Sequence, residues 1–269
     1  MGKGREDSSG AVVAVPARPE RIISLVPSVS ETLFSLGLGH RVVGVTDWCI
    51  HPGNELARVP RVRGTKNPDV EKIGTLAPDL VLANLEENRE IDVRRLREKD
   101  LCVWVDFPCT VPDVVEHVRF LAGLGAPPGA SHLADSIERA MATRADAAQE
   151  RKRRCFLAVW KDPWMTVSAA TYAHDLLARL GLENVFADAP ERYPRVTLDE
   201  IAAREPDVVL LPDEPYAFTG AEAEETARSL AGTPAGQTGS VHVVDGTLAF
   251  WHGPRTARAL NEGLVPRSR

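Results

Sequence analysis

Tryptophan is the residue type whose positions say most about chemistry in this chain. Four of the five tryptophans, Trp48, Trp160, Trp164 and Trp251, stand at or just after segments that predict buried strands, whereas Trp104 lies inside one. Indole rings offer a large, flat contact area at a small cost in side-chain entropy. Four of them at strand ends predict contact with a large, flat ligand. Packing beneath loops is the alternative, and Trp104 is expected in the core.

Cysteine and histidine could add metal chemistry. Cys49 and His51 form a Cys-x-His pair, and His252 directly follows Trp251. Sulfur and imidazole bind transition metals, so the pair could hold a metal ion or coordinate the cobalt or iron of a ligand, and His252 could be an axial ligand. A pair supplies only half of a tetrahedral site, and no Cys-x-x-Cys motif accompanies it. A structural role is therefore the alternative interpretation.

Two glutamates hold matching places in the chain. Glu86 lies eight residues after Pro78, and Glu214 lies eight residues after Pro206. Carboxylates accept hydrogen bonds from amides and amines, so both are predicted to face a ligand, together with Tyr216 in the aromatic segment that follows Glu214. For Glu86 the alternative is a helix start, where acidic residues suit the helix dipole.

Short apolar runs alternate with helical segments and supply the elements that must position these side chains. This alternation predicts parallel sheets covered by helices on both faces. Ser28 and Glu31 have the spacing of a helix capping box, and Asn67 is predicted to cap a further helix. The predicted strands cover residues 22–26, 42–45, 80–83, 101–105, 156–159, 208–211 and 241–244.

One segment without a strand pattern separates two α/β halves. Residues 127–153 are rich in Ala, Leu, Glu, Arg, Gln and Met, which predicts a single long helix. The fold class expected is therefore α/β, with two Rossmann-like lobes joined by one backbone helix and a ligand cleft between them. The predicted organisation is a disordered or extended segment 1–19, an N-terminal lobe 20–126, the linking helix 127–153 and a C-terminal lobe 154–265.

The two halves share a sequence phrase. Val70-Glu71-Lys72-Ile73 precedes Pro78-Asp79-Leu80-Val81-Leu82, and Leu198-Asp199-Glu200-Ile201 precedes Pro206-Asp207-Val208-Val209-Leu210, so each position recurs 128 residues later (70 to 198, 78 to 206). The phrase predicts a short helix, a break at Pro-Asp and a buried strand. Ligands of open α/β sheets bind beyond the carboxyl ends of the strands, so paired lobes predict a site at those ends.

Composition limits the function classes. The chain has 269 residues, 43% of them hydrophobic and 26% charged, with a net charge of −6, which excludes a disordered chain and a basic nucleic-acid footprint. Four cysteines are too few for a disulfide scaffold, and no apolar stretch has the length of a membrane span. No nucleophile elbow, Walker loop, HExxH or dinucleotide fingerprint occurs, so we expect no catalysis.

The sequence resembles the helical-backbone (class III) substrate-binding proteins of ABC importers for cobalamin, haem and ferric siderophores. The resemblance covers residues 21–264 and is greatest to the cobalamin-binding branch. It implies two rigid lobes and ligand capture without chemistry, a monomer, and no cofactor of its own. The phrases that carry it are Arg21-Ile22-Ile23-Ser24-Leu25-Val26-Pro27-Ser28 with Glu31, Val43-Gly44-Val45, the two Pro-Asp segments, Gly181-Leu182-Glu183-Asn184-Val185-Phe186 and Tyr193-Pro194-Arg195-Val196-Thr197.

The resemblance also implies functional residues. Glu71 and Asp199 match the acidic residues, one in each lobe, through which the family docks onto arginines of its permease. Thr65 stands where cobalamin binders place an aromatic residue. The implied ligand contacts are Pro27, Ser28, Trp48, Thr65 and Lys66 in the first lobe and Trp160, Trp164, Met165, Tyr193 and Trp251 in the second.

The expected function is binding of a corrinoid for delivery to an ABC importer. The alternatives are binding of a ferric siderophore or haem, and a cytoplasmic corrinoid or metal carrier. The resemblance implies a location outside the cytoplasm, whereas the first 19 residues show neither a secretory signal peptide nor a lipid-anchor cysteine. A cytoplasmic form is therefore the alternative for the compartment.

Overall fold

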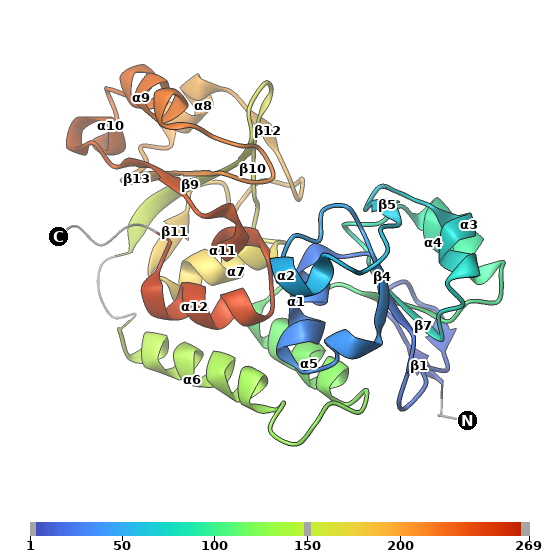
Figure 1. Ribbon diagram of the computed structural model, residues 1–269. Coiled ribbons are helices and arrows are strands. Elements are labelled where there is room, and N and C mark those ends of the chain that lie inside the picture. The colour runs from blue at the N-terminus through green and yellow to red at the C-terminus, as the bar shows by residue number, and fades with distance from the viewer. Residues whose placement is uncertain (1–3, 148–151, 265–269) are drawn as a thin grey trace. The chain divides into compact units, whose positions relative to one another are not determined.

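The computed structural model describes residues 4–147 and 152–264 and divides the chain into two compact units (Figure 1). Unit 1 contains residues 1–108 and 113–136, and unit 2 contains residues 109–112 and 137–269. Each unit has its own sheet and its own buried core. Among the helices of the described residues, none has both the length and the apolar character that crossing a membrane requires.

Unit 1 is built on a four-stranded parallel sheet in the order β4-β3-β7-β8. Its strands are β3 (Ile22–Ser24), β4 (Val42–Val45), β7 (Leu80–Asn84) and β8 (Val103–Asp106), with the small pairs β1 (Arg5–Glu6) with β2 (Val12–Val13) and β5 (Arg63–Gly64) with β6 (Asn67–Pro68). Its helices are α1 (Pro27–Ser35), η1 (Gly39–Arg41), α2 (Gly53–Leu56), α3 (Val70–Thr75), α4 (Glu90–Arg97) and most of α5 (Val111–Ala122).

The sheet of unit 1 is apolar on both faces because helices cover both. Ile23 and Val81 pack with Ile73 of α3 and Leu96 of α4 in one buried cluster, and Ile22, on the opposite face, is equally buried. Such strands read as continuous hydrophobic runs, which is the pattern that identified them in the sequence. Polar side chains can therefore reach solvent from this sheet only at the strand ends.

Unit 2 holds a mixed sheet in the order β12-β10-β9-β13-β14, with β11 paired to β9. The parallel strands β9, β11, β13 and β14 form its Rossmann-like part, and β10 and β12 add antiparallel pairs. Its strands are β9 (Arg153–Trp160), β10 (Trp164–Thr166), β11 (Leu182–Asn184), β12 (Arg195–Val196), β13 (Val208–Pro212) and β14 (Val241–Val244). Its helices are α7 (Tyr172–Arg179), α8 (Leu198–Ala203), α9 (Gly220–Ser229), α10 (Pro234–Thr238), α11 (Gly246–Phe250) and α12 (Pro254–Glu262).

The repeated sequence phrase forms the same structure in each unit. Helices α3 and α8 begin and end 128 residues apart (70 to 198, 75 to 203), as do strands β7 and β13 (80 to 208, 84 to 212). The residue before each proline has a left-handed backbone, with φ of +45° at Ala77 and +43° at Glu205. The internal repeat is therefore a repeat of backbone conformation as well as of sequence.

The aspartate of each Pro-Asp pair ties two strands together. In unit 1 the Asp79 carboxylate accepts hydrogen bonds from the backbone N–H groups of Glu20 (2.7 Å) and Arg21 (3.0 Å), just before β3. In unit 2 the Asp207 carboxylate accepts one from the N–H of Arg154 (2.8 Å), at the start of β9. Charge-assisted bonds of this kind hold the amino ends of neighbouring strands in register.

Two helix starts differ from the predicted ones. The first helical residue of α1 is Pro27, whose fixed φ and missing N–H suit that position, so Ser28 lies inside the first turn and the predicted capping box does not form. Asn67 does not cap a helix, because Asn67 and Pro68 form β6. The cap of α3 is Asp69, whose carboxylate accepts from the N–H of Lys72 (3.1 Å).

The predicted helix over 127–153 is shorter in the structure. Helix α6 runs from His132 to Ala147 and contributes to both units. It begins late because a turn occupies residues 128–131, where Gly129 has a φ of +94°, and β9 already begins at Arg153. Residues 148–151 of the predicted helix lie outside the described residues.

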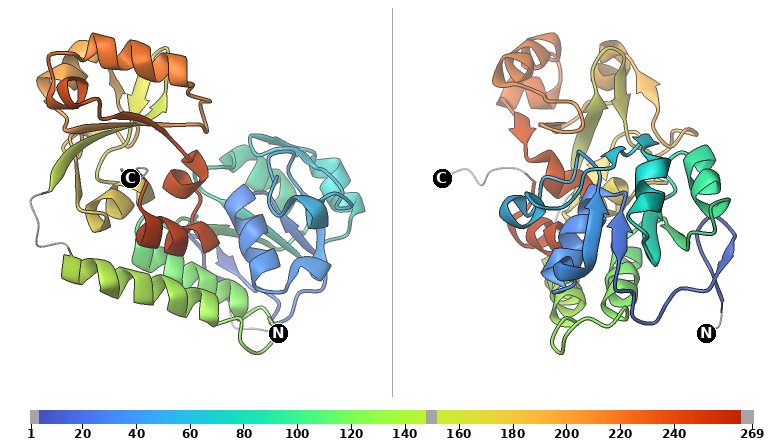
Figure 2. Two further views of the ribbon diagram at one scale, coloured as in Figure 1. Left: turned by 60° about the vertical axis from the view of Figure 1, so that its left-hand side comes forward. Right: turned by 45° about the vertical axis from the view of Figure 1, so that its right-hand side comes forward.

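Within the segment 1–19 that was expected to be disordered or extended, residues 5–13 form the hairpin of the extended strands β1 and β2 (Figure 2, dark blue). Its turn residue Asp7 is 6% exposed and makes an ion pair with Arg97 (2.6 Å). Burial alone would raise the pKa of Asp7, but hydrogen bonds from Ser9, Val105 and Ala11 outweigh it and lower that pKa. The hairpin is therefore fastened to the edge of the sheet by one buried carboxylate.

Replacing Asp7 by Asn should lower the free energy of unfolding at pH 7 by about 1–3 kcal/mol, because the Arg97 guanidinium loses its charged partner. Since folding lowers the pKa of Asp7 below its ordinary value of 3.8, the stabilisation is complete above that value and is lost as the pH falls through the folded pKa. Urea unfolding of both proteins between pH 7 and pH 3 tests this. If the difference in free energy of unfolding between the wild type and Asp7→Asn grows as the pH falls, the assignment is contradicted.

Candidate functional site

In unit 1 the predicted ligand residues gather at the carboxyl end of the sheet. Pro27 and Ser28 follow β3, Trp48 follows β4 and Glu86 follows β7. Ser28 is buried, whereas the Trp48 side chain is 64% exposed. Ligands of parallel α/β sheets bind at this end of the strands. Unit 1 therefore presents an exposed indole where the topology expects a ligand.

The turn between β5 and β6 joins this group. The side-chain amide of Asn88 donates to the Thr65 carbonyl (2.9 Å), and the Lys66 ammonium donates to the Glu86 carbonyl. A Cβ built on Gly64 would lie 3.3 Å from the indole nitrogen of Trp48, so the ring lies against this turn. The turn and the loop after β7 thus form one continuous surface with Trp48.

Two exposed apolar residues of this surface were not predicted. Ile50 is 53% exposed after β4, and Leu85 is 44% exposed after β7. Both lie at the same end of the sheet as Trp48. In the sequence they look like ordinary apolar loop residues, because exposure is decided by packing that a local pattern does not show.

In unit 2 the exposed indole is Trp160, at the end of β9. Its ring meets that of Tyr216 edge-on (5.3 Å between centroids), Tyr216 contacts Phe218 (4.6 Å), and Phe218 stacks on Trp164 (5.6 Å). Trp160 is 42% exposed and Trp164 only 9%. A row of aromatic rings therefore runs from the core to the surface and holds Trp160 at its outer end.

Trp164, a predicted ligand contact, is buried in the structure. Trp164 belongs to the hydrophobic core of unit 2 and packs edge-on against Phe156. Side chains alternate along a strand, so Trp164 and Thr166 of β10 are buried while Met165 between them is half-buried. Met165 lies opposite Trp160 in the β9–β10 ladder and remains a candidate contact.

A polar network fixes Tyr216. Its hydroxyl donates to Glu222 (2.8 Å), and the Lys161 ammonium lies 3.5 Å from the same carboxylate oxygen. The hydrogen bond from Tyr216 lowers the pKa of Glu222 to about 2. Glu222 also forms a capping box with Thr219 at the start of α9. The Thr-x-x-Glu spacing of Thr219 and Glu222 can be seen in the sequence, but the contact of Glu222 with Tyr216 cannot. Glu222 was therefore not among the predicted residues.

Glu214 lies half-buried after β13. Burial raises its pKa to about 7, and the hydrogen bond with the Trp251 indole opposes that rise only in part. Its backbone packs against Gly246, where an added Cβ would come within 2.4 Å of the Glu214 carbonyl oxygen. A carboxyl group with this pKa can either donate or accept a hydrogen bond near neutral pH.

The other predicted contacts of unit 2 are less exposed than expected. Trp251 is 8% exposed, with the Arg255 guanidinium 5.3 Å from its ring centroid. His252, predicted as an axial ligand, is also 8% exposed and packs edge-on against Tyr172 (6.3 Å). Tyr193 is half-buried, with the Arg192 guanidinium 5.8 Å from its ring.

Cys49 is a buried thiol. Its sulfur lies 3.1 Å from both the Ser30 and the Thr46 hydroxyl oxygens, and burial raises its pKa. His51 is half-buried. Within the part of the chain that the structure describes, no three His, Cys, Asp or Glu side chains come together as a metal site. The Cys-x-His pair thus gains no third ligand, and the hydrogen bonds of Cys49 match the structural alternative.

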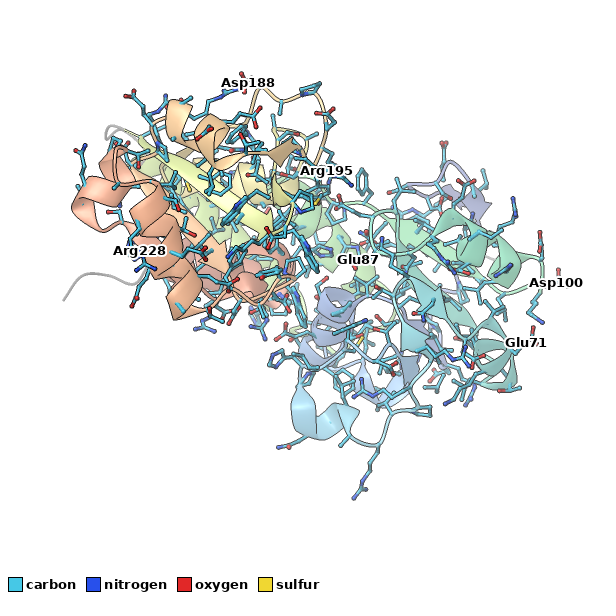
Figure 3. The ribbon with its side chains drawn as sticks, turned by 90° about the horizontal axis from the view of Figure 1, so that it is seen from above. Glu71, Glu87, Asp100, Asp188, Arg195 and Arg228 are labelled. Atoms are coloured by element: carbon cyan, nitrogen blue, oxygen red, sulfur yellow. The ribbon has the colours of Figure 1, made fainter. Side chains whose placement is uncertain are left out.

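The two acidic residues of the repeat are exposed. Glu71 stands in the first turn of α3, its side chain is 81% exposed, and its carboxylate pairs with the Lys99 ammonium (2.9 Å). Figure 3 shows Glu71 at the outer surface of unit 1. Asp199 holds the equivalent place in the first turn of α8 and is also exposed. Each unit therefore offers a solvent-facing carboxylate at the same position of the same helix.

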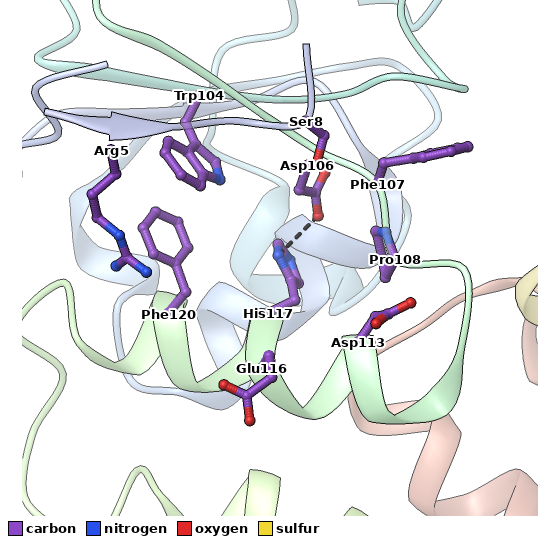
Figure 4. Close-up of a pocket in the computed structure, with 10 residues that line it drawn as sticks. All are labelled: Arg5, Ser8, Trp104, Asp106, Phe107, Pro108, Asp113, Glu116, His117 and Phe120. Carbon is purple, nitrogen blue, oxygen red and sulfur yellow. Dashed lines mark ion pairs between the residues drawn. The ribbon is translucent and has the colours of Figure 1, made fainter. Parts of the chain in front are cut away.

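A pocket of about 290 Å³ lies elsewhere in unit 1, between β8, α5 and the N-terminal hairpin (Figure 4). It contains none of the predicted ligand residues. Its aromatic wall is Trp104 stacked on Phe120 (4.6 Å), which makes Trp104 half-buried rather than fully core. At its centre the His117 ring nitrogen Nδ1 lies 2.8 Å from the Asp106 carboxylate.

Comparison with known proteins places this chain and its fold in a family. The sequence pattern of the periplasmic binding protein family matches residues 22–248. The vitamin B12-binding protein of Vibrio cholerae is 27% identical over 201 residues, which cover 74% of this chain and 72% of that protein. The chain therefore belongs to the periplasmic binding protein family, whose members bind ligands and are not enzymes.

Solved structures agree with this assignment. The periplasmic heme-binding protein RhuT from Roseiflexus sp. RS-1 superposes with a TM-score of 0.78 and 25% identity, covering 90% of this chain and 95% of that one. The periplasmic vitamin B12 binding protein BtuF of Vibrio cholerae gives a TM-score of 0.77 at 23% identity, covering 91% and 95%. The α/β fold is thus that of the class III binding proteins that the sequence resembles.

Glu214 should make stability depend on pH. Since folding raises its pKa from 4.5 to about 7, its stabilising effect is complete below pH 4.5 and is lost as the pH rises through 7. Glu214→Gln stays neutral and should therefore gain about 1–2 kcal/mol over the wild type between pH 5 and pH 8, less than the full shift implies because water reaches the group. Urea unfolding across this range tests it. A constant difference between the two proteins would contradict the assignment.

Proposed function

We propose that this protein binds a corrinoid and delivers it to an ABC importer. The observation that carries the proposal is one exposed indole at the carboxyl strand ends of each unit, Trp48 and Trp160. Tryptophan is enriched at binding interfaces, and its large flat ring suits a flat macrocycle. The relatives named vitamin B12-binding proteins point to the same ligand class.

The polar groups beside the indoles also favour a corrinoid. The periphery of a corrin carries amide groups, which both donate and accept hydrogen bonds. Glu86 is half-buried at the same end of the sheet as Trp48, and Glu214, with a pKa near 7, lies two residues from Tyr216, the ring in contact with Trp160. Carboxyl groups are suited to amides, whereas the propionates of haem would call for cations.

Haem is the second candidate, because the heme-binding protein RhuT is 25% identical to this chain. Lys66, in the turn against which Trp48 lies, supplies a cation that could pair with a propionate. His252, however, packs against Tyr172 and is poorly placed to ligate iron. Ferric siderophores are a further ligand class of the family that the sequence resembles, and the same titration tests their binding.

Titration with cobinamide or cyanocobalamin should quench tryptophan fluorescence, with half-saturation below about 10 μM, and haemin and a ferric hydroxamate should quench less. Trp48→Ala and Trp160→Ala should each weaken binding about tenfold or more, because each removes a large contact. Trp104→Phe, in unit 1 but outside the proposed surface, is the matched control. No quenching by any corrinoid at about 50 μM would sink the proposal, and tighter binding of haemin would favour the second candidate.

We also propose that Glu71 and Asp199 dock the protein onto its permease outside the cytoplasm. Support comes from their equal positions in α3 and α8 and from their exposure. Family membership supports the location. Cell fractionation of the native protein separates this from the cytoplasmic carrier.

The double variant Glu71→Lys/Asp199→Lys should leave the corrinoid Kd unchanged but lower corrinoid uptake in the native cell about tenfold or more, because two positive charges would face permease arginines. Glu98→Lys with Glu183→Lys, two exposed acids outside α3 and α8, is the matched control and should leave uptake unchanged. Equal uptake with both double variants would refute the docking proposal.

A further inference from the structure

The loop after β7, residues 85–88, is the part of the proposed ligand surface with the most elaborate polar support. It carries exposed Leu85 and half-buried Glu86 at the carboxyl end of the sheet. Asn84 precedes it and Asn88 closes it, and both are 5% exposed. The orientation of the side-chain amides of these two buried asparagines therefore decides how the loop is held.

Asn84 shapes the loop through its side-chain oxygen. Its Oδ1 accepts hydrogen bonds from the backbone N–H groups of Glu86 (2.8 Å) and Glu87 (3.1 Å). The backbone N–H of Asn84 donates to Asn88 Oδ1 (2.9 Å). The Asn88 amide then donates to the carbonyls of Thr65 (2.9 Å) and Leu25 (3.3 Å). The loop is therefore held by one amide oxygen facing two backbone donors.

The orientation of that amide is set by Asp106, at the end of neighbouring strand β8. The Asn84 Nδ2 donates to Asp106 Oδ1 (3.3 Å). A carboxylate only accepts hydrogen bonds, so it selects the amide nitrogen and leaves the amide oxygen to face the loop. A flipped Asn84 would place its oxygen against the carboxylate and its NH₂ group against the two backbone donors.

Asp106 is held in turn by His117 on α5. The second carboxylate oxygen lies 2.8 Å from His117 Nδ1, as Figure 4 shows, and both residues are 7% exposed. At this distance the imidazole ring lies directly against the carboxylate and restricts its movement. The contacts form one connected series, in which His117 contacts Asp106, Asp106 accepts from Asn84, and Asn84 accepts from the backbone N–H groups of Glu86 and Glu87.

We infer that Asp106 and His117 are positioning residues that hold the 85–88 loop in its binding conformation from behind the sheet. They act through Asn84 and need not touch ligand, and their pocket is distinct from the proposed ligand surface. The consequence for binding rests on the proposed function, whereas the consequence for the loop does not. Sequence analysis did not single out Asp106 or His117, because 22 residues separate Asn84 from Asp106 and only the fold joins them.

The loop itself is tested without ligand, by NMR-detected hydrogen exchange of the Glu86 and Glu87 amides. Asp106→Leu should speed both about tenfold or more, because Asn84 loses the acceptor that orients it. Asp106→Asn should restore most of the protection, since its amide oxygen can still accept from Asn84. If the leucine variant does not fold, His117→Phe, which removes the ring nitrogen in contact with Asp106 and keeps an aromatic ring, should give a smaller acceleration of the same two amides.

Asn184→Leu is the matched control in unit 2. Asn184 is 4% exposed, and its Oδ1 accepts from the Phe186 N–H (3.0 Å) in the same type of turn. Its loss should destabilise unit 2 and leave Glu86 and Glu87 exchange unchanged. Equal exchange of these two amides in the wild type and in Asp106→Leu, or equal acceleration in the control, would overturn the inference.

Affinity gives the second measurement. With cobinamide as the probe, Asp106→Leu should raise the Kd about fivefold or more, and Asp106→Asn should stay within about twofold of the wild type. Faster loop exchange with an unchanged Kd would overturn the role in binding. If the wild type binds no corrinoid, haemin or ferric hydroxamate, the proposed function fails, while the exchange experiment still decides whether Asp106 positions the loop.

Discussion

Burial of both faces of the parallel strands is the constraint on which the rest of this structure depends. Ile23 and Val81 on one face and Ile22 on the other are sealed by helices, so the strands cannot present polar chemistry along their length. Function is left to the strand ends, where backbone groups need partners and side chains reach solvent. At the amino ends, Asp79 and Asp207 satisfy those needs and hold the strands together.

At the carboxyl ends of the strands, the exposed groups are held in place by buried side chains beneath them. Trp160 is the exposed end of a row of rings that reaches the core through Tyr216, Phe218 and Trp164. The loop after β7 is held by Asn84. A side chain fixed before the ligand arrives loses less entropy on binding, so rigid support beneath an exposed ring contributes to affinity. Buried residues such as Trp164 then serve the site without contacting a ligand.

The sequence predicts which candidate residues stand at strand ends, but not how exposed they are. Trp48 and Trp160 are exposed there, whereas Trp164, chosen for the same reason, and His252, chosen as an axial ligand, are buried. A residue that follows a strand can point either way, because alternation along β10 and packing against Phe218 or Tyr172 decide the direction. Residue type and position in the chain therefore predict which rings stand at the end of the sheet, but not which of them are exposed to solvent.

The sequence by itself determined the order of strands and helices and the repeat of α3–β7 in α8–β13. It also determined the class of protein, a binding protein rather than an enzyme. These follow from hydrophobic runs, Pro-Asp breaks and family phrases, all of which are contiguous in the chain. Only the tertiary structure decided that Asp7 fastens the hairpin to Arg97 and that His117, Asp106 and Asn84 form one network. The physical reason is distance along the chain: hydrogen bonds between residues tens of positions apart depend on how strands and helices are brought together, and no local pattern encodes that.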